Sequence, residues 1–185
     1  VLNHVPRREQ SAKMLIDSFM PEGITQLAVD SIFMMPQLGV LAAVDKKDLK
    51  EDARKAALEV FHKDCLIRLG TCVTPVGKSK KGELLLTAEI KIQNENIRKI
   101  DIFKDDFIRI EAPYEPVDVI LTPGKNINVG GGPGEKIDTQ IYGGTVGLIF
   151  DGRERPIKIP SDSMDRLNAL NKWSNAMNEY PENKD

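Results

Sequence analysis

The sequence predicts an α+β fold, in which helices accompany a set of short, mostly antiparallel strands. Apolar residues recur at helical spacing near both ends of the chain, whereas β-forming runs alternate with Gly and Pro turns over residues 67–160. With 185 residues, the chain is long enough for one sizeable domain or two small ones. We expect an α/β unit over 1–65, a β-rich barrel or sandwich over 66–160, a docking helix over 161–180 and a disordered tail over 181–185.

The first thirty residues predict a helix and then a strand. Between residues 8 and 19, apolar side chains repeat every three or four positions and leave charged residues on the opposite face. Pro21 and Gly23 end this helix, because neither residue continues a helix well. Residues 24–29 then form a short β-type run that ends at Asp30.

Two further helices are expected before residue 65. Residues 31–44 are largely apolar and include Pro36, which is tolerated in the first turn of a helix. The helix therefore either starts late, near Pro36, or is kinked there, and we favour the late start. Asp48 and Glu51 have the spacing of a capping box, and an apolar stripe continues from them to about His62.

The β-rich region contains seven runs that we expect to be strands: 67–75, 83–93, 97–112, 117–122, 137–142, 145–151 and 157–159. A last helix follows, capped by Ser161 or Ser163. Its apolar stripe consists of Met164, Leu167, Leu170 and Met177, with Trp173 as the expected anchor.

Composition disfavours several classes of partner. The formal net charge of −2 and the pI near 5.8 provide no basic face for nucleic acid. The most apolar stretch, 32–44, is too short for a membrane span. Two cysteines, Cys65 and Cys72, do not make a disulfide scaffold, so we expect a cytoplasmic protein. The first residues show neither an initiator methionine nor a signal pattern, and we expect a fragment of a longer protein.

Glycine-rich segments invite a phosphate-binding interpretation. Four glycines occur within residues 130–134, but β-type runs surround them, whereas a phosphate loop leads into a helix. We therefore predict glycine turns between strands. The segment Gly77-Lys78-Ser79 resembles the end of a Walker A loop, but Cys72 occupies the position of the required glycine. The glycine cluster also lacks the dinucleotide-binding spacing.

Candidate chemical groups are few, and we assign no catalytic and no metal-binding residue. His62, Cys65 and Cys72 could in principle bind zinc, but no Cys-x-x-Cys pair is present. Two histidines and scattered loop carboxylates, Asp105, Asp106, Asp118 and Asp151, make no triad or acid–base pair. Arg153 and Arg155 lie in a charged turn, where they form either an internal ion pair or a contact with an anion or partner.

Several segments together resemble one known family. They include LAVDSIFMMPQLGVL at 27–41, the glycine-rich 129–134 and GGTVGLIFDGRERP at 143–156. These motifs are similar to the accessory proteins encoded beside cobalamin-dependent glutamate (methylaspartate) mutase. That family is related to hydantoinase and oxoprolinase chains and, more distantly, to diol dehydratase reactivases, in the actin/Hsp70-like ATPase superfamily.

The resemblance implies that residues 1–65 are the end of an actin-like ATPase subdomain. ATP and Mg would then bind to loops that precede Val1, so the fragment itself would be non-catalytic. His4 and either Arg7 or Arg8 would lie near the adenosine of the full-length protein; alternatively, Arg7 and Arg8 are solvated charges at the start of a helix. The implied function is ATP-dependent reactivation of a cobalamin-dependent mutase that is its partner. The alternatives are part of an ATP-dependent cyclic amidohydrolase of the hydantoinase type, and a homo-oligomerisation module without a catalytic role.

Overall fold

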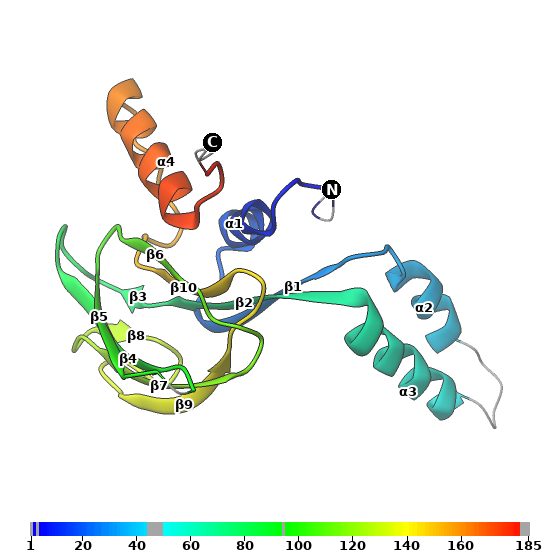
Figure 1. The fold of residues 1–185 in the computed structure, drawn as a ribbon. Helices are drawn as coiled ribbons and strands as arrows, with labels where there is room; N and C mark the ends of the chain where they lie inside the picture. The colour runs from blue at the N-terminus through cyan, green and yellow to red at the C-terminus, as the bar shows by residue number, and fades with distance from the viewer. Residues whose placement is uncertain (1, 3, 44–49, 94, 182–185) are drawn as a thin grey trace.

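The computed structural model describes residues 2, 4–43, 50–93 and 95–181. It contains two four-stranded sheets, a pair of short strands, and helices on one side of the assembly and at its far end (Figure 1). Nearly all strand pairs are antiparallel. The predicted α+β class, with mostly antiparallel strands and a C-terminal helix, is confirmed.

The first sheet has the order β1-β2-β10-β6. It consists of β1 (Gly23–Asp30), β2 (Leu66–Thr74), β10 (Gly147–Asp151) and β6 (Phe107–Ile110). β2 and β10 are parallel, and Gly70 lies opposite Gly147 in their register. A Cβ atom at Gly70 would collide with the carbonyl oxygen of Gly147, so this pairing requires glycine. Because β1 belongs to this sheet, the sheet crosses the expected division at residue 65.

The second sheet has the order β5-β4-β7-β9 and is entirely antiparallel. Its strands are β5 (Arg98–Phe103), β4 (Leu84–Lys91), β7 (Pro116–Pro123) and β9 (Ile137–Tyr142). A small ribbon of β3 (Val76–Gly77) and β8 (Ile127–Asn128) lies beside it. Buried and exposed residues alternate along β7, as expected for a strand with one face against a core.

The two sheets enclose the main hydrophobic core. Leu148 and Phe150 of β10 contribute to it from the first sheet, and Leu86, Val119 and Ile141 contribute from the second. Ile149 lies on the opposite face of β10, in a second cluster with Ala12, Ile16, Trp173 and Met177. Both faces of β10 are therefore covered, which explains why its five residues are buried without alternation.

The outer face of the first sheet is covered by α1 (Arg8–Phe19) and α4 (Ser163–Met177), which Figure 1 shows on the same side. Trp173 is only 6% exposed, which confirms it as the anchor of α4. The expected apolar stripe is only partly buried, because Met164, Leu167 and Leu170 are exposed on the part of the helix that extends beyond the sheet. The expected serine cap is wrong. Asp162 is the N-cap, and its carboxylate accepts hydrogen bonds from the amides of Met164 and Asp165.

A helical hairpin projects from the far ends of β1 and β2 (Figure 1). It contains α2 (Met35–Ala42), α3 (Lys50–Val60) and one π-helical turn, η1 (Phe61–Cys65). Pro36 lies in the first turn of α2, so the predicted late start is confirmed. The carboxylate of Asp30 accepts hydrogen bonds from the amides of Ile32, Met34 and Met35. Asp48, of the expected capping box, lies outside the described residues.

Two strand predictions are corrected by the structure. Residues 97–112 form two strands in different sheets, β5 and β6, because the chain reverses at Asp105, whose φ is 69°. Residues 157–159 form no strand. Pro156 and Pro160 flank this segment, and neither has a backbone N–H to donate to a neighbouring strand. Among the helices that the structure describes, none is long and apolar enough to cross a membrane.

Candidate functional site

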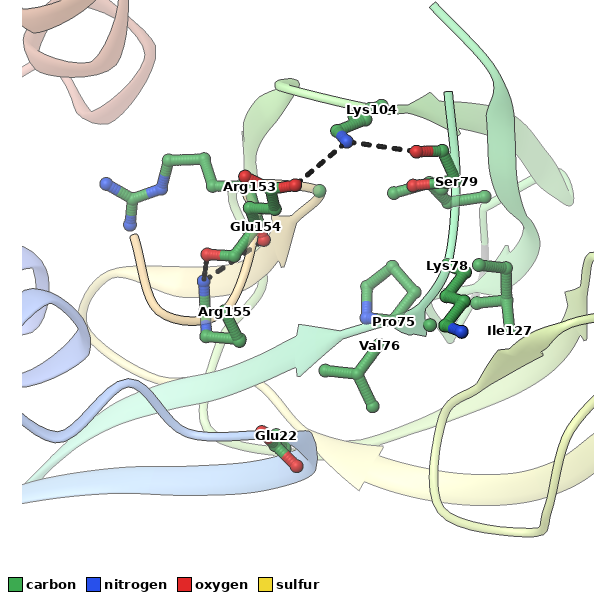
Figure 2. A pocket seen from close by; sticks show the side chains of 13 residues that line it. Glu22, Pro75, Val76, Lys78, Ser79, Lys104, Ile127, Arg153, Glu154 and Arg155 are labelled. Atoms are coloured by element: carbon green, nitrogen blue, oxygen red, sulfur yellow. Dashed lines mark hydrogen bonds and ion pairs between the residues drawn. The ribbon is translucent and has the colours of Figure 1, made fainter. Parts of the chain in front are cut away.

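A pocket of about 440 Å³ lies beside the turn that follows β10 (Figure 2). The loop after β3 forms one wall, with Lys78 and Ser79, and the turn 152–155 forms the opposite wall. Glu22, just before β1, and Lys104, just after β5, complete the rim. The pocket is thus lined by residues that precede residue 65 in the sequence and by residues that follow it, and both sheets contribute.

A buried carboxylate organises the wall formed by the turn. Asp151 is fully buried at the end of β10. One of its oxygens accepts a hydrogen bond from Nε of Arg153 at 2.8 Å, and the other accepts bonds from Arg153 at 2.9 Å and Arg155 at 2.8 Å. Two cations thus neutralise one buried anion, which is the condition for burying a carboxylate at low cost.

Arg153 lies between two aromatic rings. Its guanidinium carbon is 4.1 Å from the ring centre of Phe107 and 4.8 Å from that of Trp173. A second carboxylate, from Asp17 of α1, lies 2.9 Å from its other terminal nitrogen. Desolvation by burial lowers the pKa of Arg153, but the hydrogen bonds and charges of Asp151 and Asp17 outweigh it and raise this pKa overall. Arg153 therefore links α1, α4 and the first sheet as a permanent cation.

Arg155 is equally occupied by internal contacts. Its Nε donates to the carbonyl of Pro21 at 3.2 Å, and one terminal nitrogen donates to the carbonyl of Arg153 at 3.2 Å. The other terminal nitrogen bonds both Asp151 and the hydroxyl of Thr74. The internal ion pair, one of the two interpretations of this turn, is observed for both arginines. A contact of either residue with an anion or a partner stays a prediction, and all three side-chain nitrogens of Arg155 already donate hydrogen bonds.

The rim of the pocket has its own charge pair. Lys104 donates hydrogen bonds of 3.1 Å to the carbonyl of Ser79 and to the carboxylate of Glu154 (Figure 2). Hydrogen bonds from Lys104 and Lys158 lower the pKa of Glu154. Sequence reasoning missed the Lys104–Glu154 contact, because the two residues are fifty positions apart and no local motif joins them. The lining nevertheless holds more cations (Lys78, Lys104, Arg153 and Arg155) than carboxylates (Glu22 and Glu154).

Neither glycine-containing motif forms a phosphate cradle. Gly77-Lys78-Ser79 leaves β3 and enters a turn rather than a helix. In the loop after β8, the side-chain oxygen of Asn128 accepts hydrogen bonds from the amides of Gly130 and Gly132, at 2.7 and 3.0 Å. The amide of Gly134 donates to the carbonyl of Ile127 at 2.8 Å. These amides stabilise the loop itself, so the predicted glycine turn is confirmed.

The residues expected near an adenosine lie at the start of α1. Arg7 precedes the helix and pairs with Glu9 at 3.1 Å, while His4 is exposed. Glu9 also lies 3.6 Å from Arg109, beside a second pocket of about 420 Å³. Arg7 and Arg109 thus share the carboxylate of Glu9. The role of Arg7 near a nucleotide stays a prediction, as do those of His4 and Arg8.

The residues considered for zinc are not brought together. Cys65 and Cys72 lie near the start and the end of β2, and a strand rises about 3.3 Å per residue, so they are roughly 20 Å apart. Burial raises the pKa of the Cys72 thiol to about 12, and burial followed by the charges of Asp30 and Asp64 raises that of Cys65. The structure as described holds no group of three or more His, Cys, Asp or Glu side chains arranged to bind a metal ion.

The chain was also compared with known proteins. No family model, no curated protein and no solved structure matches it.

Proposed function

We propose that this chain is a non-catalytic part of an ATP-dependent reactivating factor for a cobalamin-dependent mutase, acting in the cytoplasm. The proposal starts from the resemblance of segments 27–41, 129–134 and 143–156 to the accessory proteins of glutamate mutase. In it, ATP and Mg bind to other parts of the full-length protein. Such a factor works by coupling, because its nucleotide states must differ in their affinity for the mutase.

One observation supports a non-catalytic role above the others. In the charged motif DGRERP at 151–156, Arg153 and Arg155 both bind the carboxylate of Asp151, so these three charges form an internal ion cluster. Segment 27–41 supplies the second half of β1 and nearly all of α2, the first helix of the hairpin. The charged side chains of the turn therefore serve internal packing, whereas segment 27–41 leads into an exposed apolar hairpin, and both suit a scaffold or binding module.

The test uses the full-length protein and its mutase. We expect the two to co-purify, and we expect ATP to restore the activity of mutase that has been inactivated by damage to its cobalamin. A non-hydrolysable ATP analogue serves as the control, because it fills the nucleotide site without allowing turnover. ATP-dependent opening of a cyclic amide in the absence of any mutase, with no restored mutase activity, would instead establish the hydantoinase-type alternative.

An oligomerisation role is the second candidate. It is favoured by the exposed apolar side chains of the projecting hairpin, which include Met35, Val40 and Leu58.

A further inference from the structure

Residues 32–64 are inserted at the end of the ladder that joins β1 to β2. Asp30 lies opposite Leu66 in that ladder. One residue further, the amide and the hydroxyl of Ser31 each donate a 2.8 Å hydrogen bond to the carbonyl of Cys65. The chain therefore leaves the sheet and re-enters it at neighbouring points, and the residues in between project as the helical hairpin (Figure 1). In many antiparallel hairpins, a two-residue turn spans such a gap.

The hairpin adds little to the packing of the two-sheet body. Within the described ranges, neither hydrophobic cluster includes a residue of 32–64. Ala57 is the only buried residue that the structure describes in this segment. By contrast, α1 has nearly the same length as α3 and buries Ala12 and Ile16 in the cluster that covers the first sheet. Since burial of apolar surface is the main source of stability, the sheets gain little from the hairpin.

Hydrogen bonds at its base connect the hairpin to the body. The carboxylate of Asp30 accepts bonds from three amides at the start of the hairpin. Arg68 of β2 donates to the carbonyl of His62 at 3.2 Å and lies 3.3 Å from Nδ1 of the same residue. Most of these bonds are exposed, so water competes for the same groups and each bond contributes little. Breaking them leaves both hydrophobic clusters of the body intact.

We propose that the hairpin is a separately unfolding arm, which opens while the two sheets remain folded and which the sheets do not need in order to fold. Segments with few buried apolar contacts open at a lower free energy than the core, and the elements that move or bind partners belong to this class. The order of the arm can therefore change without loss of the body. This inference does not depend on the activity of the full-length protein.

The first test is hydrogen exchange of the 185-residue chain, followed by mass spectrometry over increasing denaturant. We expect the amides of α2 and α3 to lose protection at denaturant concentrations that leave β4, β7 and β10 protected. The matched helix is α1, which packs on the first sheet and should lose protection together with it. Loss of protection in the hairpin and the sheets at the same concentration overturns the proposal, and so does exchange in α1 as early as in α3.

A substitution at the base of the arm tests the same point without denaturant. Asp30→Ala removes the acceptor of three amides and should raise exchange in the hairpin roughly fivefold, while exchange in β4 and β7 stays unchanged. Asp162→Ala is the matched control, because it removes a comparable acceptor at the start of α4 and should leave exchange in the hairpin unchanged. An equal rise in the hairpin and the sheets after Asp30→Ala contradicts a separate arm.

The second test removes the arm. Replacing residues 32–64 by Asn-Gly closes the ladder at Ser31 and Cys65 with a common two-residue turn. We expect the shortened chain to keep the circular dichroism of the sheets and a Tm within about 5 °C of the intact chain. Deletion of residues 163–177 is the control, since it removes Trp173 and Met177 from the second cluster and should lower Tm further. A shortened chain that lacks the sheet signal overturns the proposal.

Discussion

Asp151 is a fully buried residue that holds two arginine side chains. Its carboxylate is inaccessible to water and holds two guanidinium groups, one of which also stacks between two aromatic rings. Replacing all members of a buried ion cluster by apolar residues can be neutral, whereas removing one member leaves the others buried without their partner. The cost of a substitution here therefore depends on which charge remains uncompensated.

Asp151→Ala should lower the free energy of unfolding by about 3–5 kcal/mol, because Arg153 and Arg155 would keep their charges in a buried site. For a chain of this length, that corresponds to a fall in Tm of roughly 10 °C. Calorimetry or thermal circular dichroism measures the change.

Lys158→Ala is the matched control, since it also removes an ion pair, with Glu154, from the same turn. That pair is exposed, and its loss should cost at most about 1 kcal/mol. Similar effects of the two substitutions would contradict the structural role assigned to Asp151.

Sequence reasoning identified Arg153 and Arg155 but not the depth of their burial. The tight charged turn predicts an ion pair, and the pair is observed. The aromatic cover comes from Phe107 and Trp173, which lie 46 and 20 residues away from Arg153, and no local pattern announces such a contact. For the same reason Asp151 looked like an ordinary loop carboxylate.

Two aspartates, Asp162 and Asp30, stabilise the starts of helical segments by accepting backbone hydrogen bonds. Asp162 caps α4 with two backbone hydrogen bonds, which lower the pKa of its carboxyl group. Asp30 bonds three amides at the start of the hairpin; desolvation raises the pKa of this group, but the backbone hydrogen bonds lower it overall. Both caps stabilise the fold only while the carboxylates are ionised.

Asp162→Ala should lower Tm by a few degrees at neutral pH, because two amides of the first turn lose their acceptor. The folded pKa is lower than the unfolded one, so this stabilisation is present above the unfolded value, near 4, and is lost as pH falls through the folded value. Thermal denaturation from neutral pH to about pH 3 measures it.

Asp162→Asn separates the two contributions. Asparagine also caps helices, so this variant should keep most of the stability at neutral pH and lose the dependence on pH that Asp162 supplies. Ser163→Ala, at the adjacent position, should change little. A larger effect of Ser163→Ala than of Asp162→Ala would restore the serine cap that the sequence suggested.

Sequence reasoning correctly predicted the helices whose position is set by the residues within them. The helix of residues 8–19 and the late start at Pro36 follow from spacing and from the missing N–H of proline, and both are confirmed. The run 97–112 was wrongly expected to be one strand, because its composition stays β-forming across the turn at Asp105. The left-handed backbone conformation of Asp105 cannot be recognised from a pattern of apolar residues.

At the scale of the whole molecule, strand pairing joins segments that are far apart in the sequence. β1 pairs with β2, and β2 pairs in turn with β10, about 75 residues later. The alternation of apolar residues indicates which face of a strand is buried, but it does not say which strand lies beside it. The α+β class was therefore predictable, whereas the order of the strands and the sheet that crosses residue 65 were not.

Mg-ATP should not stabilise the 185-residue chain, since the proposed function assigns nucleotide binding to other parts of the full-length protein. A ligand that binds the folded state must raise Tm as it fills its site. A melt with millimolar Mg-ATP should therefore shift Tm by less than about 2 °C. Mg-ADP and Mg with free phosphate are the matched conditions, and a larger shift that is specific to ATP would contradict this assignment.

Trp173 is the only tryptophan of the chain, and it is stacked against a cation at the contact between α4 and the first sheet. Indole emission responds to water and to nearby charge, so the protein contains an intrinsic optical probe at this one location. Its fluorescence reports the attachment of the C-terminal helix, and it is insensitive to events at the distant helical hairpin. Detachment of α4 from an intact sheet would therefore change the emission of Trp173 while circular dichroism still reports the strands, without attaching a dye.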